Sequence, residues 1–239
     1  IFYMSLAALT LGISSCTNEE LSDSSKVIGN DRIVVDLPGA TTRTHMDETN
    51  RNKVLWTTGD EISIFSVSSN QCTNNKYTLS SGGNTQSGEF TGGVSEGSTK
   101  QAAFYPYVVG TTFDGSKISF NMSNNLTLDA DKPTENNKAP MACIISPDAQ
   151  DKISFKSAGA LLDITVRNIP TEYKKIVLTS KGENAPSISG AMEIEFSDGD
   201  PTLKVAGTAT TAASEDKTVA ISFTLSMASW PVVSSLGWT

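Results

Sequence analysis

Short runs of alternating hydrophobic and polar residues recur along this chain at intervals of about ten positions, with turn-forming residues between them. Residues 31–37 are the first clear case, because Ile33, Val35 and Leu37 share one face of an extended strand. Further strands are expected at residues 53–56, 61–67, 76–80, 88–91, 100–108, 117–121 and 141–146. Helical periodicity is not sustained after the first residues of the chain, so the pattern predicts an all-β protein.

A second series of strands is expected at residues 153–156, 160–168, 173–180, 187–196, 202–206 and 218–225. The sequence pattern changes around residues 147–151, and we place a domain boundary there. Residues 31–148 are then an N-terminal β-sandwich and residues 149–239 a C-terminal one. A seven-stranded sandwich requires roughly 100 residues, so the second unit is expected to be short or truncated. Tight turns are expected at Gly82-Gly83, Gly92-Gly93 and Asp114-Gly115.

The first residues have the character of a targeting segment. Residues 1–13 are almost all apolar or small, and a helix needs about 20 apolar residues to cross a bilayer. The sequence Ile13-Ser14-Ser15-Cys16 that follows resembles a bacterial lipobox, which makes residues 1–16 a lipoprotein signal peptide and Cys16 the lipidated residue. The alternative is an ordinary secretory segment with an incidental cysteine.

Residues 17–30 are polar and are expected to form a flexible linker. Glu19 and Glu20, just after Cys16, resemble the signal that exports Bacteroidetes lipoproteins to the cell surface. The alternative is that these two acids belong to a solvated linker and have no targeting role.

Composition narrows the functional classes. The net charge is −8 and the sequence contains no cluster of Lys or Arg residues, so nucleic acid is not an expected partner. His45 is the only histidine, which argues against histidine-cluster metal sites and histidine-based triads within the chain. The acids at 129–131 and 198–200 lack the late glutamate of a calcium loop and are expected in turns. We expect no enzyme activity, no metal and no cofactor.

Cys72 and Cys143 are the two cysteines that remain once Cys16 is assigned. Outside the cytoplasm they could form a disulfide. Two separate thiols are the favoured interpretation, because Cys143 lies in an apolar strand where a reduced cysteine packs well.

Several short motifs occur in a fixed order along the chain. They are Thr42-Arg43-Thr44, Val54-Leu55-Trp56, residues 59–65, Ala103-Phe104-Tyr105-Pro106-Tyr107, residues 139–142, residues 155–162 and residues 176–180. In this order they resemble the fimbrillin-like family of Bacteroidetes surface lipoproteins, which comprises type V pilins and their accessory subunits. The resemblance covers residues 31 to 205.

Each of these motifs also has an expected structural role. Trp56 and Phe65 are expected to be core aromatic residues, with Gly59-Asp60 as the turn between their strands. Tyr105-Pro106-Tyr107 is expected to be an edge or terminal strand, because proline cannot donate a hydrogen bond within a central sheet.

The resemblance implies two transthyretin-like sandwiches in tandem and a pilus subunit that is exported as a lipoprotein to the outer membrane. It further implies that a protease cuts between Arg43 and Thr44, after the first strand. Removal of that strand, with Ile33, Val35 and Leu37, would expose a sheet edge that a strand of another pilin subunit completes. Arg32 and Arg51 are alternative cut sites, and an uncut loop is the alternative role for Arg43.

Two other functions remain open. The chain could stay lipid-anchored as a surface adhesin or binding module for a host protein or glycan. It could also be an unrecognised hydrolase whose acids meet in a pocket. The fate of residues 16–43 distinguishes the pilus subunit from the anchored adhesin. A subunit of the pilus shaft must lose these residues, whereas an anchored adhesin keeps them.

Overall fold

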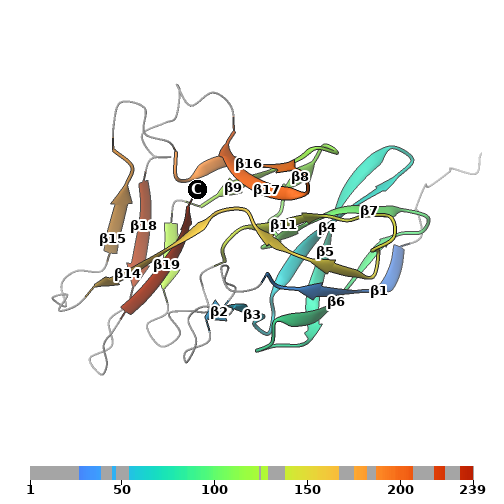
Figure 1. The fold of residues 1–239 in the computed structure, drawn as a ribbon, viewed down its shortest axis with the longest axis horizontal. Coiled ribbons are helices and arrows are strands. Elements are labelled where there is room, and N and C mark those ends of the chain that lie inside the picture. The colour runs from blue at the N-terminus through green and yellow to red at the C-terminus, as the bar shows by residue number, and fades with distance from the viewer. Residues whose placement is uncertain are drawn as a thin grey trace, which may run out of the picture.

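The computed structural model describes residues 27–38, 45–46, 54–123, 125–128, 138–166, 175–181, 187–206, 218–223 and 232–238. Cys16, Arg43 and Thr44 lie outside these residues. Within them all regular elements are strands, which confirms the all-β class (Figure 1). A search of this part of the chain finds no helix suited to spanning a membrane.

The largest sheet has eight strands in the order β12-β1-β6-β5-β4-β7-β11-β13. All neighbouring pairs whose directions are assigned are antiparallel except β1 with β12, which is parallel. The strands are β1 (Val27–Asp36), β4 (Glu61–Ser68), β5 (Gln71–Ser81), β6 (Ser87–Ser95), β7 (Thr99–Tyr105), β11 (Met141–Ile144), β12 (Lys152–Ser154) and β13 (Lys156–Ser157).

The eight-stranded sheet closes on itself through one short segment. β12 and β13 stand at opposite ends of the strand order, yet only Phe155 separates them along the chain. β12 pairs with β1, and β13 pairs with β11. Residues 152–157 therefore join the two edges of the sheet, which leaves an enclosed interior lined by one face of each strand.

Aromatic and aliphatic side chains fill this interior around Trp56. The Trp56 ring is fully buried and meets Phe90, Tyr105 and Phe155 at centroid distances of 4.7, 5.6 and 6.2 Å. The turn that follows Trp56 is closed by the Asp60 amide, which donates to the Thr57 carbonyl, with Gly59 at φ +90°. The expected roles of Trp56 and of the Gly59-Asp60 turn are confirmed.

A second, four-stranded sheet covers the outer face of β4, β7 and β11. Its order is β17-β16-β9-β8, with β8 (Thr112–Phe113), β9 (Lys117–Met122), β16 (Gly190–Ser197) and β17 (Asp200–Val205). Phe65, Phe104 and Ala142 pack there against Ile118, Ile194 and other apolar side chains of the second sheet. Because β4 and β7 are covered on both faces, they are buried almost continuously and do not alternate.

The remaining strands form three small sheets. β10 (Asn125–Leu128), β18 (Thr218–Phe223) and β15 (Lys175–Thr179) pair in the order β10-β18-β15; β14 (Ala160–Val166) pairs with β19 (Val232–Trp238); and β2 (His45–Met46) pairs with β3 (Val54–Leu55). Figure 1 shows β14, β15, β18 and β19 away from β1, β5 and β6.

Strand pairing crosses the expected domain boundary at residues 147–151. β12 and β13 complete the sheet that contains β1, and β16 pairs with β9. The sheets therefore do not divide at residues 148 and 149, because strands from both sides share one hydrophobic interior. The tandem transthyretin-like topology stays a prediction.

Two local expectations were wrong. Gly92 and Gly93 lie inside β6 and not in a turn, with Gly92 paired to both Asp31 and Tyr77. β7 lies between β4 and β11, so Pro106 does not mark an edge strand. β7 stops at Tyr105, so the proline lies just beyond a central strand and does not interrupt its hydrogen bonds.

Candidate functional site

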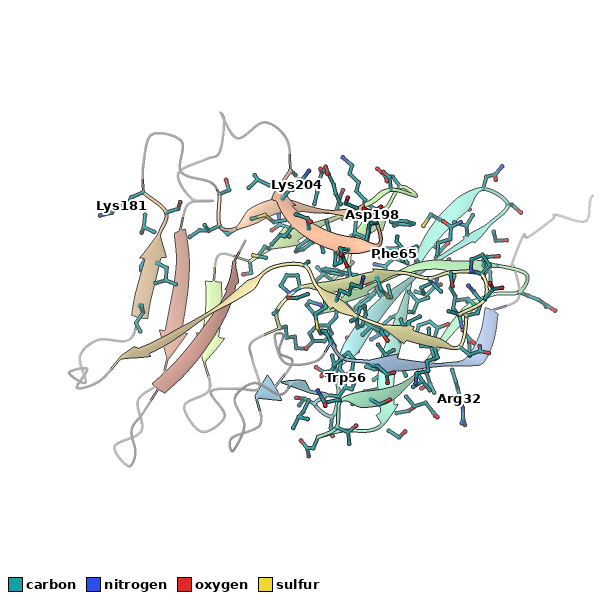
Figure 2. The ribbon with its side chains drawn as sticks, viewed as in Figure 1. Arg32, Trp56, Phe65, Lys181, Asp198 and Lys204 are labelled. Atoms are coloured by element: carbon teal, nitrogen blue, oxygen red, sulfur yellow. The ribbon has the colours of Figure 1, made fainter. Side chains whose placement is uncertain are left out.

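The candidate exchangeable strand is β1 with the residue that follows it. Ile33 and Val35 are fully buried, and Leu37 is nearly so. Arg32 alternates with them and points away from the sheet (Figure 2). We call the surroundings of this strand the β1 site: β6, β12 and the side chains that cover Ile33, Val35 and Leu37.

β1 has sheet partners on both edges over part of its length. Along one edge it pairs with β6 from Val27 to Asp36. Along the other it pairs with β12 from Val34 to Asp36, and the Phe155 amide donates to the Asp36 carbonyl at 2.9 Å. The resemblance implied that removal of this strand would expose an open sheet edge. The structure corrects this expectation over residues 34–36, where loss of β1 would leave a gap between β6 and β12.

The buried face of β1 is tied to the interior by an indole hydrogen bond. Trp56 Nε1 donates to the Val35 carbonyl at 3.0 Å, and this contact is buried. Ile33 stands opposite Phe90 in β6, and Val35 stands opposite Gly88 on one side and Ile153 on the other. Burial of each aliphatic side chain contributes about 1.5–3 kcal/mol.

Gly88 leaves room for the Trp56 ring beneath β1. A Cβ at this position would lie 2.6 Å from Leu79 Cδ1 and 2.7 Å from Trp56 Cδ1. We expect Gly88→Ala to lower the free energy of unfolding by about 1–3 kcal/mol in urea denaturation, because the packed ring must shift. Gly83→Ala is the control, since within 4 Å its Cβ meets only Thr58, with the hydroxyl oxygen at 3.0 Å and the backbone nitrogen at 3.8 Å. Equal stability of the two variants would contradict this packing.

The outer face of β1 carries ion pairs. Lys152 Nζ lies 3.0 Å from Asp36 Oδ2, and Arg32 lies 3.4 Å from Glu89 with its side chain mostly exposed. The Ser87 hydrogen bond, together with Lys152, lowers the pKa of Asp36 below its ordinary value. An exposed ion pair contributes little to stability, so these contacts are a minor part of what holds β1 in the sheet.

The lowered pKa of Asp36 predicts a pH dependence. The ionised form is favoured in the folded protein, so its contribution is present above the unfolded-state pKa near 3.8 and is lost as the pH falls through the folded value. Asp36→Asn should therefore be less stable than the parent protein at about pH 6, with a smaller difference at about pH 3. Urea denaturation at both values measures this. A difference that grows on acidification would contradict it.

A charged cluster lies on the inner side of the same strand. Lys100 Nζ is 2.7 Å from Asp31 Oδ2, and the Tyr77 hydroxyl donates a hydrogen bond to the same carboxylate. The Lys100 side chain is 5% exposed and Tyr77 is fully buried. Burial is the larger cause, and the hydrogen bond to Asp31 the second, of a pKa for Tyr77 that lies far above its usual range. The sequence contains one signal for this cluster, an acid at position 31 that shares the apolar face of Ile33.

A second buried acid holds the turn after Trp56. Asp60 accepts hydrogen bonds from the Thr57 amide at 2.8 Å and from the Tyr105 hydroxyl at 3.0 Å. Lys138 Nζ lies 3.9 Å away and also approaches the Tyr105 ring. These contacts fix the turn that positions Trp56, which is a structural role.

The other candidate groups are scattered. His45 lies in β2 opposite Leu55. Asp198 and Gly199, both with positive φ, form the turn between β16 and β17, as expected for Asp198, whereas Asp200 is the first residue of β17. In the residues described, no three His, Cys, Asp or Glu side chains gather as metal ligands would.

The two described cysteines are free thiols, as favoured by the sequence. Cys72 is exposed, and Cys143 is buried in the interior beside β7. Burial raises the pKa of the Cys143 thiol to about 12. This thiol therefore stays protonated at neutral pH, which makes it unreactive.

Comparisons with known proteins give one distant likeness. No family model matches the chain, and no curated protein matches it. The crystal structure of a fimbrial protein from Bacteroides ovatus aligns with it at a TM-score of 0.32 and 13% sequence identity. The alignment covers 81% of this chain and 48% of that protein, so the chain matches about half of its length. A likeness at this level does not assign the chain to a family.

Proposed function

We propose that this protein is a structural or accessory subunit of a surface fimbria, assembled by exchange of its first strand. The proposal rests on the ordered motifs of the sequence and on the β1 site, and not on the distant solved structure. One observation carries it: β1 is the first strand described, and it supplies a row of buried aliphatic side chains between two other strands.

The position of β1 along the chain makes it separable by a single cut. Every other strand of its sheet follows it in sequence, so cleavage after residue 43 would leave β1 attached only by non-covalent contacts. Loss of the strand would expose Trp56, Phe90 and Ile153 and would leave unpaired backbone groups on β6 and β12. Both consequences favour pairing with a strand from another chain.

Export completes the proposal. Lipidation at Cys16 would carry the precursor to the outer membrane and the cell surface. Cleavage between Arg43 and Thr44 would then release the lipid and β1 together, because both lie on the same side of the cut. The expected partners are other pilin subunits.

Arg43→Ala tests the cut site. In cells that assemble the fimbria, we expect this variant to keep its leader and to run as a monomer on a denaturing gel without heating. Arg51→Ala is the matched control, because it removes a nearby arginine and should polymerise normally. Normal polymerisation of Arg43→Ala would remove this residue from the mechanism.

A second function is favoured by how firmly β1 is held. Its two-sided pairing and the inner ion pair to Lys100 would also suit a strand that never leaves. In that case the protein is a permanently lipid-anchored adhesin for a host protein or glycan. N-terminal sequencing of the surface protein separates the two, since an anchored adhesin retains residues 16–43.

A further inference from the structure

The apolar face of β1 begins with a carboxylate. Asp31 is in phase with Ile33, Val35 and Leu37, and its side chain is 19% exposed. Its partner Lys100 belongs to β7, four places away from β1 in the strand order. The ion pair therefore crosses the interior of the closed sheet and joins β1 to the opposite wall.

The surrounding strands are shaped to bring these groups together. In β7 the register shifts between Ala102 and Lys100, so two residues of β7 oppose one of β4. Ala102 packs in the outer cluster, while Lys100 reaches the interior, as such a bulge allows. The Lys100 ammonium also donates to the Gln150 carbonyl at 2.9 Å.

Gly92 of β6 lets Tyr77 reach the same carboxylate. Gly92 stands between Tyr77 and Asp31 in adjacent strands. A Cβ on Gly92 would lie 2.5 Å from Tyr77 Cδ2, so the ring lies directly over this glycine. From there the hydroxyl extends to Asp31. Two buried donors from two strands thus converge on one acid of β1.

Departure of β1 would leave these donors without their shared acceptor. Lys100 would keep the Gln150 carbonyl, but its charge would lose the carboxylate, and Tyr77 would lose its acceptor. Breaking a buried ion pair by removing one partner is strongly unfavourable, because the remaining charge stays in a poorly solvated place. An incoming strand that offers only aliphatic side chains would not correct this.

We propose that the strand that replaces β1 carries a carboxylate at the position of Asp31, two residues before the first of three alternating aliphatic side chains. This inference rests on the proposed function and specifies the partner as a subunit strand with that pattern. The acid also fixes register, because a shift by one residue would move it to the outer face and leave Lys100 unpaired. Strands with aliphatic residues alone are thereby excluded.

Peptide exchange on the full-length chain tests this inference. The chain carries a site-specific protease sequence in place of residues 40–44 and is cleaved in solution, so that β1 stays bound without a covalent link. A fluorescent peptide of residues 27–38 is added in excess in mild urea, and its incorporation is measured by size-exclusion chromatography. The test peptide carries Asp31→Asn, and the matched control carries Asp36→Asn, an acid on the outer face.

The Asp31→Asn peptide is expected to bind at least tenfold more weakly than the unaltered peptide, on the order of 30-fold. The Asp36→Asn peptide should bind within about threefold of it, because that ion pair is exposed. With a Lys100→Met acceptor, the penalty for Asp31→Asn should largely disappear. Because the first comparison alters only the peptide, the fold of the acceptor is not at risk.

The outcomes separate the inference from the proposed function. Equal binding of the Asp31→Asn and unaltered peptides would overturn the carboxylate requirement while strand exchange stands. Incorporation of none of the peptides would overturn strand exchange, and the requirement with it. Selective loss of the Asp31→Asn peptide supports both.

Discussion

Trp56→Ala is expected to lower the free energy of unfolding by about 3–5 kcal/mol, the range for truncating a large buried aromatic residue. The Trp56 ring is fully buried and contacts aromatic rings from β6, from β7 and from the segment that closes the sheet. A domain of this kind is typically stable by only about 5–15 kcal/mol. The substitution would therefore remove a large share of the stability, as urea denaturation followed by circular dichroism can measure.

Trp56→Phe separates packing from the hydrogen bond. It keeps an aromatic ring but removes the Nε1 donor to the Val35 carbonyl. We expect a smaller loss of about 1–3 kcal/mol, together with faster hydrogen exchange in β1. A Trp56→Ala variant within about 1 kcal/mol of the parent protein would show that this ring does not organise the interior.

Ile33→Ala is expected to lower the free energy of unfolding by about 2–5 kcal/mol, because it leaves a cavity opposite Phe90 in the middle of the β1 site. Val34→Ala is the matched control, since Val34 is the neighbouring aliphatic residue on the outer face of the same strand and is only partly buried. Val34→Ala should lower the free energy of unfolding by less than about 1 kcal/mol. The comparison uses urea denaturation of both variants at one pH.

Similar costs for Ile33→Ala and Val34→Ala would contradict the structure of the β1 site. The difference between them depends on which face of β1 packs inward, and a strand shifted by one residue would reverse it. A larger loss for Val34→Ala would therefore indicate the opposite register.

Local features of the fold could be predicted from the sequence. The inward face of β1 followed from the alternation of Ile33, Val35 and Leu37, and the turn at Gly59-Asp60 followed from its residue types. Both depend on neighbouring residues only. β19 was not predicted, because Val232 and Val233 are followed by two serines and the segment shows no clear alternation of apolar and polar residues.

Long-range pairing could not be predicted in the same way. β12 and β16 were assigned to a second domain because they follow residue 148, yet they pair with β1 and β9. A hydrophobic period shows that a strand has a buried face, but it does not show which strand lies beside it. The closure of the sheet through Phe155 depends on such pairing.

The contacts of Asp31 with Lys100 and Tyr77 could not be predicted from the sequence for a related reason. Asp31 could be recognised as an acid on an apolar face, but its partner Lys100 reaches the interior only through a register shift in β7. Regular alternation would place Lys100 with Ala102 on the outer face. Gly92 was similarly interpreted as a turn residue, whereas its lack of a side chain accommodates the Tyr77 ring.

The mass of subunits in the assembled fibre tests the central claim most directly. Polymers that resist detergent are collected from the cell surface, dissociated by heating, and the intact mass of this protein is measured. Strand exchange after cleavage predicts a chain that begins at Thr44 and has lost both Cys16 and β1. A polymerised chain that still contains residues 27–38 would contradict the account, because its own β1 would still be available to fill the β1 site.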